Sequence, residues 1–279
     1  MKKCATILLQ RNYPKATNEF GEKLLHSNSD HTDFYVVESG SDPDQLSNYK
    51  KNTFHADWPE AIKSGLRTGM GFNYGLLELK KRNLDYEYIV LATGDTKLPD
   101  DEPLISIMIE EFENNEKMGI ISPISYKWGD KVTAFNKKKI TLASYYPTPH
   151  VMWMFRRECI EDIARENDDY TYMRYLYDGT NFRAYACDAE LIIKAFKNNW
   201  CFAITSKTSI QEEDDMTDKN HKQMKTESSA VHKDLMYREG LKWLKEKYGF
   251  DNKLQMWSLI RSSYETFFTN NPDQRELKQ

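Results

Sequence analysis

Cysteine, histidine clusters and long apolar runs are scarce in this sequence, and their scarcity excludes several classes of protein. The four cysteines, Cys4, Cys159, Cys187 and Cys201, are scattered without a CxxC pair, and no histidines cluster at ligand spacing. This pattern argues against a structural zinc site and is typical of reduced thiols in a cytoplasmic protein. No apolar run approaches the roughly 20 residues that a membrane-spanning helix needs.

The N-terminal stretch also lacks the full set of features of a secretory signal. Met1-Lys2-Lys3 precedes the apolar letters CATILL, but the run is short and meets Arg11 and Asn12 without a small-residue cleavage site. A first β-strand explains the run better. We therefore expect no transmembrane segment, although a peripheral association with a membrane is compatible with the sequence.

An excess of positive charge is missing as well. The net charge is -4 at pH 7, which gives no general attraction to nucleic acid or to an anionic membrane. The sequence has no basic stripe, so a nucleic-acid partner is not expected. What the sequence does have is the composition of a folded protein, because 39% of its 279 residues are hydrophobic and 13% are aromatic. A chain of this length can bury a sizeable core.

Short apolar runs alternate with helical patterns along the first half of the chain. Continuous apolar runs predict buried strands, and apolar residues at i, i+4 and i+7 predict helices. This alternation predicts an α/β fold with a mostly parallel central sheet flanked by helices. The expected strands are 4–9, 34–37, 86–92 and 119–121, the last stopped by Pro123; the expected helices are 20–25, 59–66, one from Phe72 that follows an interruption at Gly69 and Gly71, and 103–114.

The second half is less regular. A hairpin turn is expected at 137–139, and 211–229 has almost no apolar residue, which predicts a mobile loop or lid. We expect a nucleotide-sugar-binding half over 1–125, an acceptor-binding half over 126–230 and a C-terminal helical extension over 231–279. Further strands are expected at 152–155 and 200–204, and further helices over 155–163, from Asp188, over 237–248 and over 257–267.

Carboxylates follow two of the predicted strands, where ligands bind in parallel sheets. Glu38, followed by Ser39-Gly40-Ser41, can accept the N–H of a uracil-like base or a ribose hydroxyl. Asp95, in Thr93-Gly94-Asp95, can hold a divalent cation that neutralises a diphosphate. Ordinary turns use the same residue types, so both interpretations stay open at this point.

Three further residues are candidates for the acceptor side. Asp188 lies near the start of a predicted helix, where an ionised carboxylate is stable and can act as a general base; taken alone, an N-cap role is favoured for it. Trp153, in an aromatic-rich stretch, can stack on a sugar ring or belong to the core. Arg156 can pair with phosphate or lie at a solvated helix start.

Seven segments, in order, resemble landmarks of family-2-type glycosyltransferases of the GT-A fold. They span about residues 4 to 200, and their order and spacing carry the resemblance more than any single motif does. The segments are ATILLQRNYP, VVESGSDPD, GFNYGLLEL, YEYIVLATGDTKLPD, GIISP, FRRECIEDI and CDAELIIKAFKNNW.

The resemblance implies a nucleotide-diphosphate sugar as donor and a divalent cation, Mn²⁺ or Mg²⁺, as cofactor. Asp95 matches the second carboxylate of the family's D-x-D motif and would hold the metal and the diphosphate. The family's downstream metal-binding histidine would fall near Gln211. The implied donor-binding residues are Gln10, Arg11, Glu38, Gly40, Asn73, Thr93 and Asp95.

The resemblance also implies the reaction. Asp188 matches the catalytic-base aspartate, with Glu190 beside it. The base would deprotonate a hydroxyl of a glycan, lipid-linked glycan or other acceptor as the nucleotide diphosphate leaves, with inversion at the anomeric carbon. We place acceptor contacts at Trp153 and Arg156.

Departures from the family pattern keep two alternatives open. Thr93 replaces the first acid of D-x-D, Cys187 replaces a glutamate, and Gln211 is a poorer metal ligand than histidine. These changes are compatible with a catalytically weakened or inactive protein that still binds nucleotide sugars. A sugar nucleotidyltransferase is the other alternative, although 10–17 contains no glycine for a phosphate loop.

Overall fold

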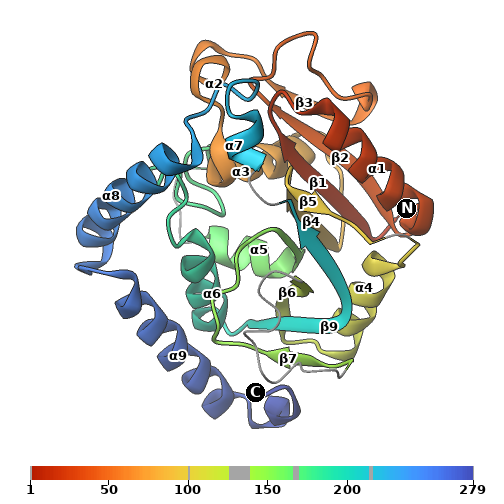
Figure 1. Cartoon of the computed structure of the whole chain (residues 1–279). Helices are drawn as coiled ribbons and strands as arrows, with labels where there is room; N and C mark the ends of the chain where they lie inside the picture. Colours follow the sequence, from red (N-terminus) through yellow and green to blue (C-terminus); the bar gives the residue numbers. More distant parts are fainter. Residues whose placement is uncertain (1, 100, 126–138, 166–169, 214–215, 279) are drawn as a thin grey trace.

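A mixed sheet forms the centre of the fold (Figure 1). The structure, a computed structural model, describes residues 2–99, 101–125, 139–165, 170–213 and 216–278. The strand order is β3-β2-β1-β4-β8-β6-β9-β5, and β7 pairs with β9 outside this path. The strands are β1 (Cys4–Gln10), β2 (Thr32–Ser39), β3 (Thr53–Ala56), β4 (Tyr88–Thr93), β5 (Thr96–Lys97), β6 (Met118–Ser125), β7 (Thr141–Ala143), β8 (Met152–Arg156) and β9 (Cys201–Glu212).

Most strands of the sheet run in the same direction. Strands β1 to β4 are parallel to one another, β8 is antiparallel to both β4 and β6, and β9 is parallel to β6. This confirms the predicted α/β class with a mostly parallel sheet flanked by helices. The helices are α1 (Pro14–Asn28), α2 (Pro59–Ser64), α3 (Arg67–Lys81), α4 (Leu104–Asn114), α5 (Arg157–Ala164), α6 (Cys187–Lys197), α7 (Met216–Asn220), α8 (Ser229–Tyr248) and α9 (Lys253–Asn270), with short 3₁₀ turns at Lys50–Asn52 and Pro272–Leu277.

The register of the central strands brings their carboxyl ends to one edge. Gln10, the last residue of β1, pairs with Glu38 of β2. On the other side of β1, Leu9 pairs with Thr93, the last residue of β4. Side chains that follow these strands therefore meet at a single edge of the sheet, as the sequence predicted.

Helices α1 and α3 cover opposite faces of the first half of the sheet. Side chains alternate between the two faces along a strand. Phe34 of β2 faces α1, where its ring lies 5.8 Å from that of Phe20. Val37 of β2 and Ile7 of β1 face α3 at Gly75. Both faces are apolar and covered, which explains why these strands are continuous apolar runs.

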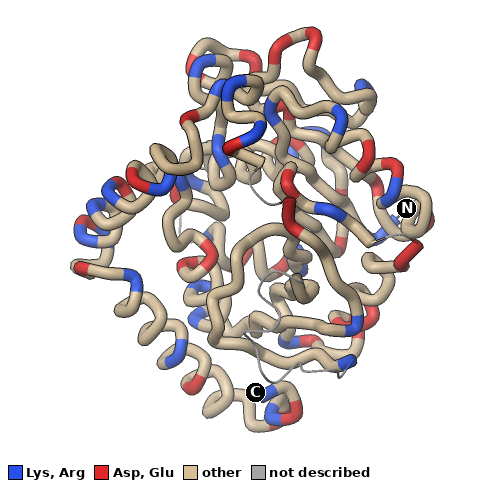
Figure 2. The backbone as a smooth tube through the Cα atoms, in the orientation of Figure 1, with Lys and Arg blue, Asp and Glu red and all other residues tan. Residues whose placement is uncertain are grey.

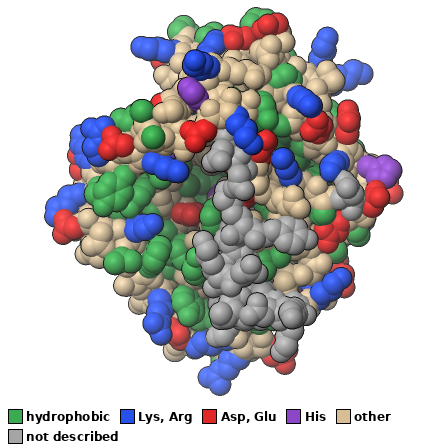
Figure 3. Space-filling model, viewed as in Figure 1, with side chains coloured by type: hydrophobic (Ala, Val, Ile, Leu, Met, Phe, Trp, Pro, Cys, Tyr) green, Lys and Arg blue, Asp and Glu red, His purple; other side chains and the backbone are tan. Residues whose placement is uncertain are grey.

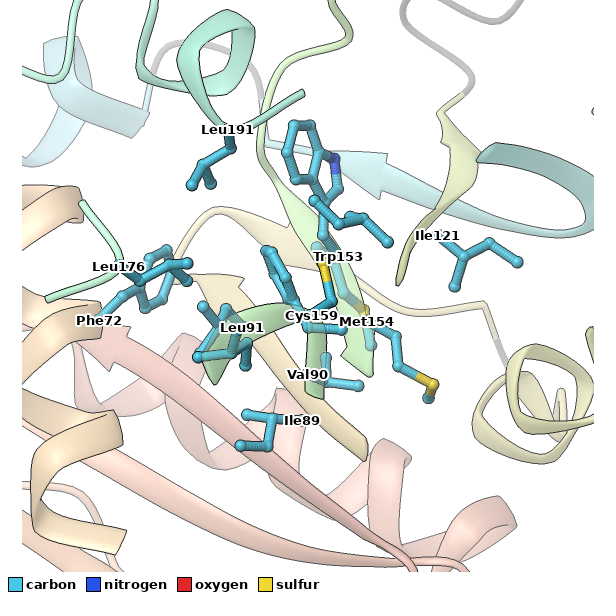
Figure 4. Close-up of a cluster of buried hydrophobic side chains, with 14 of the residues drawn as sticks. Phe72, Ile89, Val90, Leu91, Ile121, Trp153, Met154, Cys159, Leu176 and Leu191 are labelled. Atoms are coloured by element: carbon cyan, nitrogen blue, oxygen red, sulfur yellow. The ribbon is translucent and has the colours of Figure 1, made fainter. Parts of the chain in front are cut away.

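The core continues into the second half of the chain without a break. Buried side chains from α3, β4, β8 and α6 meet there, among them Phe72, Leu91, Trp153 and Leu191 (Figure 4). Helix α9 packs on α6, and together with α8 it forms the outer edge on the left of Figure 1. The division at 125/126 and 230/231 stays a prediction.

Two local expectations, one at glycines and one at a proline, were wrong. Gly69 and Gly71 do not interrupt a helix but lie inside α3. Glycine lowers the stability of a helix, but it is tolerated where it allows close packing. A Cβ at Gly71 would overlap the side chain of Leu9. Strand β6 does not stop at Pro123 but runs to Ser125, with a register irregularity after the proline, where an N–H is missing.

The polar segment 211–229 is more ordered than its composition suggested. Strand β9 extends to Glu212, α7 covers Met216–Asn220, and α8 begins at Ser229. Long-range hydrogen bonds anchor the segment, since Asn12 Nδ2 donates to the carbonyl oxygen of Gln223 at 2.7 Å. The predicted turn at 137–139 falls largely outside the described residues. In the described part of the chain, no helix combines the length and apolar character needed to span a bilayer.

Candidate functional site

A cavity of about 800 Å³ lies at the carboxyl ends of β1 and β4, opposite the start of α6. Its volume is that of a site for a small-molecule ligand or cofactor. Figure 3 shows this face of the molecule, with apolar side chains gathered over α8 and α9 beside the hollow. The residues discussed below that line it are Gln10, Arg11, Ser39, Arg67, Thr68, Thr93, Asp95, His150, Arg183, Ala184, Tyr185, Ala186, Asp188, Glu212, Lys253 and Trp257.

The cavity brings together residues that are far apart in the sequence. Gln10 and Asp95 belong to the predicted nucleotide-sugar-binding half (1–125), Asp188 to the predicted acceptor-binding half (126–230) and Lys253 to the C-terminal extension (231–279). Asp95 and Asp188, two of the three carboxylates expected to converge, therefore share one hollow. The third, Glu38, does not line it.

Glu38 lies one layer behind the cavity wall. The residue is 1% exposed, and its carboxylate accepts hydrogen bonds from Gln10 Nε2 and, at 2.8 Å, from the backbone N–H of Ser47. Gln10 Oε1 in turn accepts from the backbone N–H of Tyr13 at 2.9 Å. Glu38 thus fixes the orientation of Gln10, which does reach the cavity.

Gly40 shapes the turn after β2 and does not line the cavity. Its φ of +71° lies in the left-handed region that glycine adopts at no steric cost. A Cβ at this position would overlap the backbone carbonyl of Ala61. The close approach of two backbone segments therefore accounts for the glycine.

The turn after β4 holds Thr93 and Asp95 against the end of β9. The Thr93 hydroxyl donates to the Asp95 carboxylate, and the carbonyl oxygen of Asp95 accepts from the backbone N–H of Glu213 at 2.8 Å. Glu212 also lines the cavity and accepts from the Ser125 hydroxyl at 2.8 Å. Two carboxylates, Asp95 and Glu212, thus stand on this side of the hollow.

Carboxylates are the ligand type that a hard cation takes when it also binds ligand phosphates. Mg²⁺ commonly takes one or two protein carboxylates and completes its shell with phosphate oxygens and water. Gln211 pairs with Lys97 in the sheet, is exposed and lies outside the cavity lining, because neighbouring residues of a strand face opposite sides. Across the described ranges, no three His, Cys, Asp or Glu side chains form a metal-binding group.

Asp188 lies in the first turn of α6 and faces the cavity. One carboxylate oxygen accepts from the backbone N–H of Ala189 at 2.8 Å. Burial raises the pKa of Asp188 to about 6, and the charge of Lys253 acts weakly in the opposite direction. Such a carboxylate is ionised at neutral pH, yet basic enough to accept a proton from a hydroxyl as that oxygen attacks.

The backbone before α6 is unusual. Ala184 and Ala186 have φ values of +56° and +54°, a region that residues with a Cβ rarely adopt. Non-glycine residues held in this way concentrate at functional sites. Both alanines line the cavity beside Asp188, so this turn sets where the first turn of α6 points.

Glu190 has a structural position on the side of α6 away from the cavity. Two residues along a helix correspond to about 200° of rotation, which separates Glu190 from Asp188. The residue is 2% exposed; its carboxylate accepts from the Tyr248 hydroxyl at 2.5 Å and pairs with Lys247 at 2.8 Å. These contacts join α6 to α8.

The remaining expected site residues lie outside the cavity lining. Trp153 is fully buried in the core (Figure 4). Its ring stacks on that of His150, with centroids 4.4 Å apart. Arg156 donates to the carbonyl oxygens of Phe112 at 2.7 Å and Met118 at 3.1 Å. Asn73, fully buried in α3, donates to the carbonyl oxygens of Tyr172 and Tyr177 and accepts from the backbone N–H groups of Leu176 and Tyr177.

Sequence reasoning missed several cationic and aromatic residues that line the hollow. Arg67 has a φ of +50° at the start of α3, and Arg183 and Lys253 approach from loops and helices distant in the sequence. Tyr185 and Trp257 form aromatic parts of the wall. No local motif distinguishes these side chains from ordinary surface residues, so only the fold identifies them.

Two solved structures share this fold. The first is S. aureus TarS, residues 1–349, with a TM-score of 0.51 and 13% identity; the match covers 100% of this chain and 83% of that chain. The second is described as a mycobacterial protein, with a TM-score of 0.50 and 10% identity, covering 88% of this chain and 74% of the other. No family model and no curated protein sequence matches.

These likenesses define the class of the fold. The chain has a GT-A-like α/β fold, with a mostly parallel, curled central sheet flanked by helices. At such low identity the likeness establishes the architecture alone.

Proposed function

We propose that this protein transfers a sugar from a nucleotide-diphosphate donor to a hydroxyl acceptor, with inversion, as family-2-type glycosyltransferases do. One observation carries the proposal: Asp188, whose pKa is about 6, and the strand-end residues Thr93 and Asp95 line the same cavity. An acid–base residue thus faces the edge of the sheet where α/β proteins bind their ligands. The glycosyltransferase-like fold supports the same conclusion.

The donor would lie against the ends of β1, β2 and β4. Gln10, oriented by Glu38, and the neighbouring Ser39 offer polar groups to the nucleotide. Asp95 and Glu212 would hold the divalent cation together with the donor phosphates. A bound Mn²⁺ or Mg²⁺ would supply positive charge for the diphosphate leaving group.

The acceptor would enter from the side of α6, α8 and α9. Tyr185 and Trp257 offer aromatic faces to a sugar ring, which is the contact that the sequence suggested for Trp153. The acceptor hydroxyl would lie near Asp188. As its oxygen bonds to the anomeric carbon, its proton passes to Asp188, and the bond from that carbon to the diphosphate oxygen breaks with its electron pair on the leaving group.

Substitution of the base tests the proposal. Asp188→Asn keeps the size of the side chain and removes the proton acceptor, so turnover should fall by about 10²- to 10⁴-fold. The dissociation constant for the nucleotide diphosphate should change less than twofold. The measurement is release of nucleoside diphosphate from a panel of nucleotide sugars with Mn²⁺, in the presence of candidate glycan acceptors.

The control is Asp234→Asn, because Asp234 is exposed on α8, where it pairs with Arg238, and does not line the cavity. It should turn over at the wild-type rate. A wild-type rate for Asp188→Asn would remove Asp188 from the mechanism. Tight donor binding by the wild type without any release or transfer would favour the alternative of a nucleotide-sugar-binding protein, and pyrophosphate formed from a nucleoside triphosphate and a sugar phosphate would favour a nucleotidyltransferase.

A further inference from the structure

Arg11 is a buried guanidinium that makes no ion pair with a carboxylate of the described residues. The residue is 8% exposed and lines the cavity directly after β1. Its Nη2 donates to the carbonyl oxygen of Ile62 at 2.6 Å, whereas Nε and Nη1 are buried without a hydrogen-bond partner among the described residues. The Asp42 carboxylate is bound by Lys225 and Asn12 instead. Arg11 therefore has two unmet donor atoms.

A second arginine brings further positive charge to the same wall. Arg67 lines the cavity at the start of α3. Burial and, after it, the charge of Arg67 lower the pKa of Arg11. Arg67 shares the Glu227 carboxylate with Arg183, at 2.7 Å and 2.8 Å, and Arg183 also binds Glu239. Nε of Arg67 is also buried and unpartnered within the described chain.

The first turn of α3 adds to this positive field. No side chain caps the helix, and no acidic residue stands in its first turn. The free backbone N–H groups and the helix dipole at such an end favour an anion. Thr68, the next residue, also lines the cavity. The helix end and the two arginines thus face the same hollow.

We propose that Arg11, Arg67 and the first turn of α3 form a site for the diphosphate group of the donor, and that this site binds its anion even when no divalent cation is present. Burial of an unpaired charge is unfavourable unless a partner arrives. A diphosphate supplies that partner, because guanidinium groups bind phosphate oxygens through two parallel hydrogen bonds. The assignment of the anion to a sugar donor rests on the proposed function, whereas the anion site itself does not.

Inorganic pyrophosphate is the probe that separates these two claims. Its binding is measured by titration calorimetry in EDTA at constant ionic strength, with orthophosphate as the comparison anion. Wild type should bind pyrophosphate in EDTA, and more tightly than orthophosphate. Arg11→Met and Arg67→Met, which keep an apolar stem, should each weaken pyrophosphate binding at least tenfold. Arg238→Met, which removes an exposed arginine of α8, should change it less than twofold.

The melting temperature of the free protein checks that the effect is local. Arg11→Met removes an unpaired buried charge, so its melting temperature should not fall below that of Arg238→Met by more than a few degrees. If Arg11→Met does not fold, Arg11→Lys replaces it as the test. Lysine keeps the positive charge but lacks the planar guanidinium that forms two parallel hydrogen bonds, so this variant should bind pyrophosphate at least threefold more weakly than wild type.

Two results would overturn the site: pyrophosphate binding by wild type only when Mn²⁺ is present, or wild-type affinity in the folded variants at Arg11. Failure of the proposed function gives a different pattern, because pyrophosphate would still bind through Arg11 while no nucleotide sugar is consumed. The protein could also transfer sugar while failing to bind pyrophosphate in EDTA. That result would support the proposed function and contradict the arginine site.

Discussion

At the scale of the residue, burial determines what Asp188 can do. The pKa of this carboxyl, about 6, is above the ordinary 3.8 because burial disfavours its charged form. A base must be ionised to accept a proton, so turnover should rise with pH around 6 and level off above about 7. A rate independent of pH between 5 and 7.5 would contradict the role of Asp188.

The same shift predicts a dependence of stability on pH. Because the pKa of Asp188 is higher in the folded state than in the unfolded state, its protonated form stabilises the fold. This contribution to the free energy of unfolding, up to about 3 kcal/mol, is fully present below about pH 4 and is lost as the pH rises through 6. Asp188→Asn does not titrate, so its free energy of unfolding relative to wild type should increase from pH 4 to pH 7. Urea unfolding at several pH values measures this difference, and Asp234→Asn should show no such trend.

At the scale of the element, the close contact of α3 with the sheet positions its first turn at the cavity. A Cβ at Gly75 would lie 2.9 Å from Val37 Cγ2 and 3.0 Å from Ile7 Cγ2, both on stiff β-branched side chains. Gly75→Ala should therefore lower the free energy of unfolding by about 1 kcal/mol, although alanine favours a helix by a similar amount. Urea unfolding measures the change.

A double-mutant cycle provides the control for this contact. Val37→Ala opens space beside Gly75, so the double variant should be more stable than the sum of the two single changes by at least about 0.5 kcal/mol. Lys81→Ala, on the exposed end of α3, should stay within about 0.5 kcal/mol of wild type. Strict additivity of Gly75→Ala and Val37→Ala would show that steric overlap is not the cause.

At the scale of the whole molecule, the C-terminal helices complete the cavity and support the helix that carries Asp188. Ile260 of α9 is fully buried against the core. Ile260→Ala should lower the free energy of unfolding by about 2–5 kcal/mol, and the chain should still unfold in one transition. Leu254→Ala, 59% exposed on the same helix, should change it by less than about 0.5 kcal/mol. Circular dichroism during heating distinguishes one transition from separate melting of α9.

Helix α8 carries charges of both signs on its surface. Along α8, positive and negative residues alternate rather than forming a basic stripe (Figure 2). The helix has few buried residues, among them Trp243 and Leu244. Its helical pattern in the sequence is correspondingly weak, and the structure starts the helix eight residues before the predicted Tyr237.

The strands β1, β2, β4 and β6 were predictable, because strands buried on both faces are apolar throughout; the short strands β3 and β5 were missed, because two to four residues show no period. Local features misled where tertiary contacts override them, as at Gly71 and Pro123. The polar segment before α8 likewise gains its order from distant partners such as Asn12, which its own composition does not reveal.

By itself, the sequence determined the α/β class and the edge of the sheet where Asp95 lies. Both follow from the spacing of apolar residues within short stretches and from the alternation of those stretches along the chain. Only the tertiary structure decided that Asp188 faces this edge, that Glu38 and Glu190 do not line the cavity, and that Arg11 and Arg67 do. Those facts depend on which distant segments share a wall and on how much water each group loses. No local stretch of the chain specifies which side chains are buried or which distant side chains pair.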